Sequence, residues 1–566
     1  MHLERIEISG FRGIKRLSLT FDELSVLIGE NAWGKSSLLD ALSIALSPDA
    51  QFYNFKFSDF HVDYTLGNKK MTQLQIILHW KEDAEGEHIA RRYKGFERFW
   101  VLKHNIRHLY YQIESVIEND KVITYRRFLN HHGREIHCDE NDRMIKRWMV
   151  LHPVVRLRDA RRLRYYDDEN KPLHDSNNHE QLQSNSHSDN HVNGNAQQEA
   201  RIQKRLDNTC RRLMTQPGHV NSGELKSSIK ALHSLVDHYF AFAPHQRQRN
   251  FNRAHFPNFA QYAEHPFEQL IPKNLSKQNQ LVLLGLLNAF IRARGPVSLK
   301  RLSRPILIVE DPEGRLHPTI LQQAWSFISS MPMQKILTTN SPELLSSVPL
   351  QSIKKLIRQA DRTQVFEVGK RTLGKDETRR VSFHVRLHRP NALFARAWLL
   401  VEGETEVWLF NELARYCGYN LAAEGVQIIE FAQSGLRPLV KIARSLGIEW
   451  HLISDGDMAG RKYAETVRNM LGTDAERHRL TVLPDRDIEH YLYNQGYEAL
   501  FKQLSGIQGD APINAHKIIQ RALKRHAKPD VALAIVEYTH EGKVDEVPLL
   551  IRWLLKRIVA MSRGVS

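Results

Sequence analysis

Residues 399–406 read LLVEGETE, and residues 453–457 read ISDGD. In each stretch an apolar run that is typical of a buried strand ends in acidic residues. If the two strands are neighbours in a parallel sheet, their ends bring these carboxylates into one cleft. Like charges so close together are costly unless divalent cations neutralise them. The pattern therefore predicts an Mg²⁺ or Mn²⁺ site on oxygen ligands, and phosphodiester chemistry is its natural use.

The bulk composition indicates a large basic protein with more than one domain. The chain has 566 residues and a net charge of +16, which suits a polyanionic partner such as nucleic acid. No apolar run is long enough to span a bilayer, and residues 1–6 lack the apolar core of a signal peptide. The three cysteines are widely separated, which argues against a disulfide framework or a Cys-rich zinc site. We expect a cytoplasmic protein with no membrane partner.

A second motif, near the start of the chain, is typical of nucleotide binding. Residues 29–36 read GENAWGKS and fit the P-loop pattern, with a strand-like run before them at 25–28 and a predicted helix after them at 35–45. Backbone amides and the helix N-terminus would hold the phosphates of ATP. Lys35 would reach the β and γ phosphates, and Ser36 would hold Mg²⁺. The predicted ATP-binding residues here are Gly29, Asn31, Gly34, Lys35, Ser36 and Ser37.

A P-loop needs acidic partners on a neighbouring strand, and residues 306–313, ILIVEDPE, supply them. Glu310 would anchor the Mg²⁺ shell, and Asp311 would polarise the attacking water.

The combined pattern resembles the ABC-type ATPase heads of the SMC and RecF class. Those heads usually carry Asp-Glu-Pro-Glu and then Leu-His-Pro, where this chain has the acids exchanged and then Leu316-His317-Pro318. The resemblance places a signature motif around Ser276, without the usual glycines, and a switch residue at Asn340 in place of His. Because Asn cannot carry a proton at neutral pH, we expect ATP binding rather than brisk turnover. ABC signatures act across a dimer, so the resemblance implies a homodimer or higher homo-oligomer.

The carboxylate motifs resemble those of TOPRIM domains, which have Glu-Gly after a first strand and Asp-x-Asp after a later one. An ABC head followed by a TOPRIM domain is the architecture of OLD (overcoming lysogenisation defect) nucleases, here of the stand-alone type. The resemblance implies that Glu489, in the acidic motif at 483–492, joins the metal site, and that Lys528 stabilises charge on the reacting phosphate. The predicted catalytic and metal residues are Glu402, Glu406, Asp455, Asp457, Glu489 and Lys528.

Two-metal chemistry predicts the division of work among these acids. One metal, held mainly by Glu402 and Asp455, would activate a water, and a second, supported by Glu406, Asp457 or Glu489, would stabilise the leaving 3′ oxygen. TOPRIM topoisomerases attack with a tyrosine instead, and Tyr491 and Tyr493 lie near the acidic motif, so a covalent route stays open. Hydrolysis is favoured, because no recognisable tyrosine-bearing winged-helix domain accompanies the motif.

The expected fold is α/β, an ABC head with a helical insertion followed by a parallel TOPRIM sheet. We assign residues 1–160 and 271–385 to the head, 161–270 to a dimerising insertion with a disordered loop at 174–198, and 390–566 to the TOPRIM domain. Segments at about 155–172 and 200–270 look mostly helical, and residues 275–291 are predicted to form one helix. Arginines at 156–164 and 247–253 would track a phosphate backbone or contact the ATPase.

The sequence thus predicts an ATP-binding, metal-dependent DNA endonuclease or nickase in DNA repair or phage defence. The alternative is a non-cleaving, ATP-dependent DNA clamp or repair mediator of the RecF type, against which the complete set of acids argues. A nuclease that acts on RNA is a third reading, which charge and metals permit equally.

Overall fold

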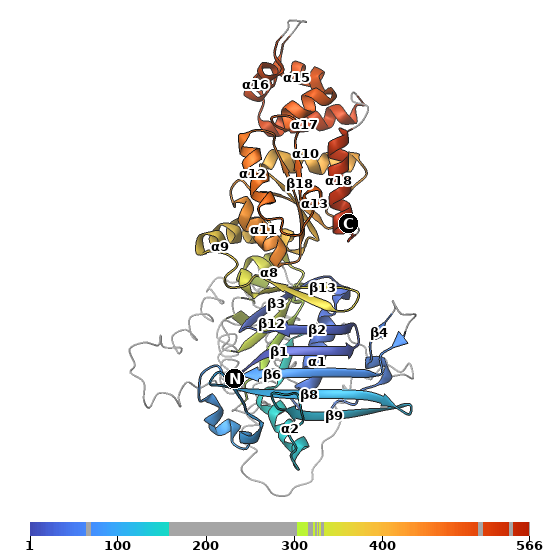
Figure 1. Ribbon diagram of the computed structural model, residues 1–566, viewed down its shortest axis with the longest axis vertical. Helices are drawn as coiled ribbons and strands as arrows, with labels where there is room; N and C mark the ends of the chain where they lie inside the picture. Colours follow the sequence, from blue (N-terminus) through green and yellow to red (C-terminus); the bar gives the residue numbers. More distant parts are fainter. Residues whose placement is uncertain are drawn as a thin grey trace, which may run out of the picture. The chain divides into compact units, whose positions relative to one another are not determined.

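The chain divides into two units. The computed structural model describes residues 1–63, 69–157, 303–314, 333–507, 513–542 and 547–564, with single positions between 318 and 329 (Figure 1). Unit 1 comprises Met1–Ser347 and Leu356–Val365, and unit 2 comprises Val348–Lys355 and Phe366–Ser566. The predicted insertion, the loop at 174–198, the helix at 275–291 with Ser276, and the arginines at 247–253 lie outside the described residues, so the predicted domain boundaries stay predictions.

Unit 1 is built on a 12-stranded sheet with the order β10-β11-β12-β3-β13-β14-β2-β1-β6-β8-β7, in which β9 also pairs with β8. The strands are β1 (His2–Phe11), β2 (Ile14–Thr20), β3 (Leu24–Ile28), β6 (Gln73–Lys81), β7 (Val101–Lys103), β8 (Ile106–Glu118), β9 (Lys121–Leu129), β10 (Val154–Leu157), β11 (Ile306–Glu310), β12 (Gln334–Thr338), β13 (Ile353–Arg358) and β14 (Thr363–Glu367). A short pair, β4 (Val62–Asp63) and β5 (Lys69–Lys70), stands apart. Its helices include α1 (Lys35–Ala45), α2 (Asn141–Leu151) and α8 (Pro342–Ser346).

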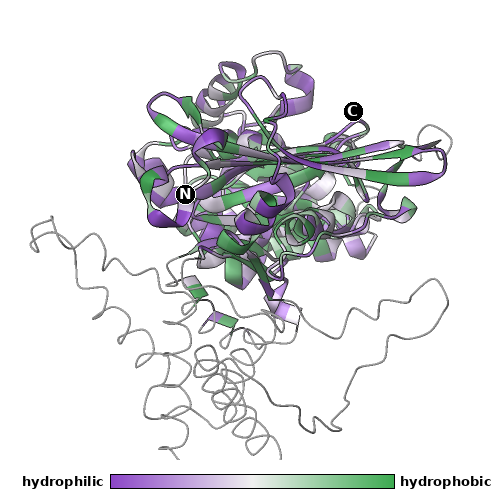
Figure 2. Ribbon diagram, turned by 90° about the horizontal axis from the view of Figure 1, so that it is seen from below, coloured by the Kyte–Doolittle hydropathy of each residue, from purple (hydrophilic) through white to green (hydrophobic). Residues whose placement is uncertain are grey.

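The two halves of this sheet follow from two hydrophobic patterns. Strands β10, β11, β12 and β3 pair in parallel, and β11 is a continuous buried apolar run, as strands covered on both faces are. Strands β1, β6, β8 and β9 pair antiparallel, and β6 alternates buried and partly exposed positions. Figure 2 shows hydrophobic and hydrophilic residues interleaved along these long strands. The parallel half therefore supplies strand ends for a nucleotide site.

The first residues of the segment predicted to be mostly helical, about 155–172, form a strand instead, and positions 158–172 lie outside the described residues. Val154–Leu157 forms β10, which pairs in parallel with β11 in the register Val154 to Ile306. The β-branched pair Val154 and Val155 is buried there and packs well on a pleated surface. Helix α2, which precedes this strand, packs Trp148 edge-on against Trp80 with ring centroids 5.3 Å apart.

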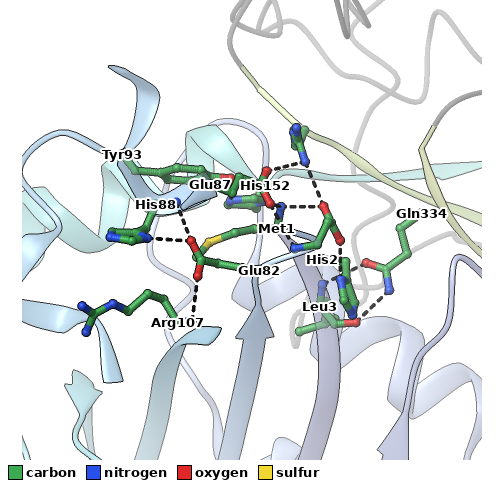
Figure 3. Close-up of polar contacts among 12 residues, drawn as sticks. Met1, His2, Leu3, Glu82, Glu87, His88, Tyr93, Arg107, His152 and Gln334 are labelled. Atoms are coloured by element: carbon green, nitrogen blue, oxygen red, sulfur yellow. Dashed lines mark hydrogen bonds and ion pairs between the residues drawn. The ribbon is translucent and has the colours of Figure 1, made fainter. Parts of the chain in front are cut away.

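A polar network ties the start of β1 to its neighbours (Figure 3). The Met1 amino group lies 2.6 Å from Asp83 and also contacts Glu87. The backbone of Leu3 donates to the Gln334 side chain at 3.0 Å and accepts from it at 2.7 Å, which joins β1 to β12. These contacts fix the position of β1 at the junction of the two halves.

Unit 2 contains a four-stranded parallel sheet with the order β16-β15-β17-β18. Its strands are β15 (Ala397–Val401), β16 (Val426–Glu430), β17 (Glu449–Ser454) and β18 (Leu480–Val482). Its helices include α9 (Lys375–Val381), α10 (Glu404–Tyr416), α11 (Leu436–Ser445), α12 (Met458–Arg468), α13 (Glu476–Arg479), α14 (Ile488–Leu492), α15 (Glu498–Ser505), α16 (Ala515–Arg525), α17 (Lys528–His540) and α18 (Leu549–Ser562). Helices α10 and α18 pack on one face of the sheet and α11 and α12 on the other (Figure 1).

The predicted alternation of strands and helices after Ala397 is confirmed, and with it the α/β fold. Strand β15 is buried at all five positions, as expected for the centre of a sheet that is covered by helices on both faces. Within the described residues, no helix has the length and apolar character needed to cross a bilayer.

Candidate metal and nucleotide sites

The acidic residues of unit 2 follow three neighbouring strands at the same edge of the sheet. Strand β15 pairs in parallel with β17, and β17 pairs in parallel with β18. Glu402 follows β15, Asp455 follows β17, and the loop after β18 leads to Glu489 in α14. Parallel pairing therefore places the carboxyl ends of these strands together, as the sequence predicts.

Three further acids begin the helices that follow these strands. Glu406 Oε2 accepts a hydrogen bond from the Gly403 N–H at 3.1 Å at the start of α10. Asp457 Oδ1 caps α12 by accepting from Gly460 N–H at 2.7 Å, and Asp487 Oδ1 caps α14 by accepting from His490 N–H at 2.8 Å. Each of these carboxylates uses one oxygen to hold its loop, which leaves the second oxygen for another partner.

A glycine lets two of these acidic loops meet. The Gly456 N–H donates to the Asp485 carbonyl at 3.1 Å. A Cβ atom at position 456 would lie only 2.3 Å from that oxygen, so any other residue would force the loops apart. Gly456 separates Asp455 from Asp457, and its small size therefore determines how closely the acids after β17 and β18 approach.

The electrostatics show how strongly the acids interact. Burial, together with the charges of Glu406 and Glu402, raises the pKa of Asp455 to about 8. Burial and then the charges of Glu406 and Asp457 also raise the pKa of Glu402. Such shifts arise where negative charge exceeds what the protein's own cations compensate. An oxygen-only donor set with excess negative charge fits a hard divalent cation such as Mg²⁺ or Mn²⁺.

One lysine faces this cluster. Lys528 is the first residue of α17, and its Nζ lies 3.6 Å from Glu489 Oε1. Glu489 is 7% exposed, and burial raises its pKa although the charge of Lys528 opposes the shift. The charge of Glu489 in turn raises the pKa of Lys528 and keeps it protonated. The Lys528 side chain is 61% exposed, so it can reach a ligand at the edge.

The structure adds residues that the sequence did not single out. His490 Nδ1 lies 2.5 Å from Asp487 Oδ1, and its Nε2 lies 3.1 Å from His516 Nδ1. The spacing of Asp487 and His490 by three positions at a helix start was the available signal. Tyr463 is close enough that the charges of Glu402 and Asp457, after burial, raise its pKa.

Both candidate tyrosines of the covalent route belong to the hydrophobic core. Tyr491 is 4% exposed and Tyr493 9% exposed, and both pack in the core of unit 2. The Tyr493 hydroxyl donates at 3.2 Å to Glu498, a residue outside the predicted metal site. Their placement in the core does not support the covalent route.

The P-loop of unit 1 has the predicted strand–turn–helix context. Gly34, with φ at 94°, precedes α1, where a Cβ atom would lie 3.0 Å from Ile14. Lys35 is 3% exposed, and its Nζ donates to the Gly29 carbonyl and, at 3.3 Å, to Asn340 Oδ1. Burial lowers the pKa of Lys35, while the charges of Asp311 and Glu313 oppose that shift.

Two of the other predicted P-loop side chains are open to solvent, and a third hydrogen-bonds within the protein. Asn31 and Ser36 are exposed, and Ser37 Oγ accepts from Gly13 N–H at 3.3 Å.

The acidic strand end beside the P-loop is held by an arginine. Arg156 in β10 places Nη2 at 2.8 Å from Glu310 Oε2 and Nη1 at 2.5 Å from Asp40 Oδ1. Of the two roles considered for Arg156, the structure therefore favours the ATPase contact. Asp311 accepts from Thr338 Oγ1 at 3.0 Å.

Glu313 links the acidic loop to the predicted switch residue. Its Oε1 accepts from the Asn340 N–H at 2.6 Å, and its Oε2 accepts from Thr339 Oγ1 at 3.0 Å. Asn340 thus lies between Lys35 and Glu313. Leu316 and His317 lie outside the described residues.

Comparison with known proteins adds a family to this geometry. A family model described as "Protein of unknown function (DUF2813)" matches residues 1–392, more than half of the chain. The chain belongs to this family. The "Uncharacterized protein YbjD" of Escherichia coli (strain K12) is 40% identical over 572 residues, which cover 100% of both chains. The DUF2813 region contains the P-loop and its acidic partners.

A second model, "Overcoming lysogenization defect protein-like, TOPRIM domain", matches residues 393–457. This range contains Glu402, Glu406, Asp455 and Asp457, and it confirms the predicted resemblance to OLD proteins. A DUF2813 region and an OLD-like TOPRIM region thus share one chain.

Other matches are more distant. The "DNA replication and repair protein RecF" of Oceanobacillus iheyensis is 40% identical over 45 residues, 8% of this chain and 12% of that protein. The C-terminal region of the Burkholderia pseudomallei OLD protein is 19% identical, with a TM-score of 0.26 over 31% of this chain and 100% of that one. The SMC head domain from Thermotoga maritima is 11% identical, with a TM-score of 0.30 over 65% and 100%.

Proposed function

We propose that this protein is an ATP-binding, divalent-metal-dependent DNA endonuclease or nickase that hydrolyses phosphodiester bonds in unit 2. The observation that carries the proposal is that Glu402, Asp455 and Glu489 follow neighbouring strands of one parallel sheet, near enough that, after burial, the charges of Glu402 and Glu489 raise the pKa of Asp455, with Lys528 beside Glu489. The net charge of +16 supports a polyanionic substrate.

The residues divide the work as follows. Glu402 and Asp455 would hold one Mg²⁺ or Mn²⁺, and Glu489 with the second oxygens of Glu406 and Asp457 would support another. Such cations, when bound, generate a nucleophile from water and stabilise the leaving oxygen. Lys528, kept protonated by Glu489, would neutralise charge that develops on the phosphate.

The ATPase unit would control this reaction. ATP phosphates would replace the Gly29 carbonyl and Asn340 as partners of the Lys35 ammonium. Asn340 hydrogen-bonds without exchanging protons, which favours a slow ATPase that sets the state of a homodimer or higher homo-oligomer. The Glu310 carboxylate would then contact both Arg156 and the Mg²⁺ of the nucleotide.

Cleavage of a supercoiled plasmid tests the proposal. The full chain with Mg²⁺ or Mn²⁺ should nick or linearise the plasmid, and chelation should stop the reaction. Glu402→Gln should abolish cleavage, whereas Glu465→Gln, an exposed acid on α12, should cut like the wild type. If the wild type leaves the plasmid intact with every metal and binds DNA in response to ATP, the protein is the non-cleaving clamp instead. Digestion of RNA but not DNA would identify the other substrate.

A further inference from the structure

Three side chains with nitrogen and oxygen donors meet on the outer face of the antiparallel half of unit 1. Glu4 Oε2 of β1 lies 3.2 Å from His79 Nδ1 of β6 and 3.9 Å from His108 Nδ1 of β8. His79 Nε2 lies 2.9 Å from His108 Nδ1. Across the described residues, these three form the one group of metal-capable side chains whose donor atoms all lie within 4.8 Å of one another.

Strand register and a bulge create this meeting. His79 pairs with Tyr110, and Lys81 pairs with His108, so His79 and His108 are diagonal neighbours on one face. In a regular strand, Glu4 and Arg5 would point to opposite faces, but the register shifts between Leu3 and Arg5. Leu3 and Ile6 are both fully buried, so Glu4 and Arg5 both lie on the outer face. Bulges of this kind redirect a side chain.

The carboxylate-to-imidazole distances fit a coordinated cation, which would replace the 2.9 Å hydrogen bond between His79 Nε2 and His108 Nδ1. Ligand atoms at about 2.1 Å in a tetrahedral shell lie about 3.4 Å from one another. The distances from Glu4 Oε2 to the two imidazoles, 3.2 and 3.9 Å, lie on either side of that value. Two imidazoles with one carboxylate are typical ligands of Zn²⁺ and related first-row cations, unlike the oxygen-only donors of unit 2.

Neighbouring side chains hold the donors in place. Lys81 Nζ lies 3.4 Å from Glu4 Oε1, the oxygen that does not face His79. The Tyr110 ring stacks on His79 with centroids 4.3 Å apart, which fixes the imidazole plane. The side chains are 30% exposed at Glu4, 15% at His79 and 6% at His108, so solvent reaches the group from the carboxylate side.

We propose that Glu4, His79 and His108 form a binding site for a transition-metal cation of the Zn²⁺ class, with solvent as the fourth ligand. The cation joins β1, β6 and β8 across the sheet of unit 1. Its donors and location are separate from the acids of unit 2, so this site does not depend on the proposed nuclease activity.

Zinc titration of the full chain tests this site. Protein stripped by a chelator is titrated with Zn²⁺ against a chromogenic chelator in excess Mg²⁺, which occupies the oxygen-only sites. The wild type should bind one more tight equivalent of Zn²⁺ than His79→Gln, while His137→Gln, whose imidazole is 92% exposed, should match the wild type.

Glu4→Gln is the milder variant and should weaken that equivalent at least about tenfold. Circular dichroism verifies that each variant is folded, and if His79→Gln is not, Glu4→Gln decides the question. Equal tight binding by the wild type, His79→Gln and Glu4→Gln would overturn the proposal.

Discussion

Replacing Asp455 by Asn should stabilise unit 2 when divalent cations are removed. The pKa of this carboxyl rises from 3.8 to about 8 on folding, because it is buried among other acids. The folded state therefore holds the proton more tightly than the unfolded state, and ionisation lowers stability progressively as the pH rises from about 4 to about 8. Asn cannot ionise, so the variant escapes this penalty.

The magnitude follows from the shift. About four pKa units at 1.36 kcal/mol each give a ceiling of about 5–6 kcal/mol above pH 8. Two effects reduce this ceiling. The neighbouring carboxylates can rearrange, and Asn buries an amide at a cost, so the expected gain is about 2 kcal/mol at about pH 9. Roughly a third of the gain should remain at about pH 5, because that pH lies only about one unit above the pKa of the unfolded carboxyl.

Hydrogen exchange of β15 and β17 peptides in the full chain measures this gain locally, because the two units need not open together. Wild type, Asp455→Asn and the exposed control Glu465→Gln are compared in EDTA at each pH. Saturating Mg²⁺ should reverse the order, since the cation neutralises the wild-type acids while the variant has lost a ligand. Equal protection of wild type and Asp455→Asn at about pH 9 in EDTA would refute the reasoning.

Substitutions at three further positions test the nucleotide site, the lysine beside the acids and the glycine between the acidic loops. Lys35→Ala should weaken ATP binding at least about tenfold in a fluorescent-nucleotide titration, because its ammonium would contact the phosphates; unchanged affinity would contradict the P-loop assignment. Lys528→Met should slow plasmid cleavage about 100-fold with metal affinity retained, and Lys528→Arg should restore part of the rate; wild-type cleavage by Lys528→Met would remove its proposed role. Gly456→Ala should lower both cleavage and Mn²⁺ affinity, since its Cβ would meet the Asp485 carbonyl at 2.3 Å; wild-type Mn²⁺ binding measured by calorimetry would show that the loops need not approach.

The strands and the motifs that follow them were predictable from local pattern. Strand β3, the turn at Gly34 and helix α1 are contiguous in sequence, so their apolar run and glycines define the site without knowledge of the fold. The acids after β15 and β17 were predictable for the same reason, since a buried run that ends in carboxylates is visible in the sequence. Glu489 and Lys528 came from family resemblance, and their 3.6 Å contact joins positions 39 residues apart.

Other parts of the sites depend on pairings that local pattern does not contain. Arg156 reaches Glu310 because β10 pairs with β11, which lies about 150 residues later in the chain, and a basic run in the sequence looks equally suited to nucleic acid. Glu4 meets His79 and His108 only because of a bulge, and one extra residue in a strand leaves no composition signal.

The proposed nuclease activity is best tested by the rate at which supercoiled plasmid becomes nicked at saturating Mg²⁺, measured for wild type and Asp455→Asn side by side. The proposed metal site predicts cleavage by the wild type and a loss of at least about 100-fold in the variant, because Asp455 would hold the cation that activates the water. Rates within about twofold of each other would show that the carboxylates at the edge of the unit 2 sheet do not perform the chemistry.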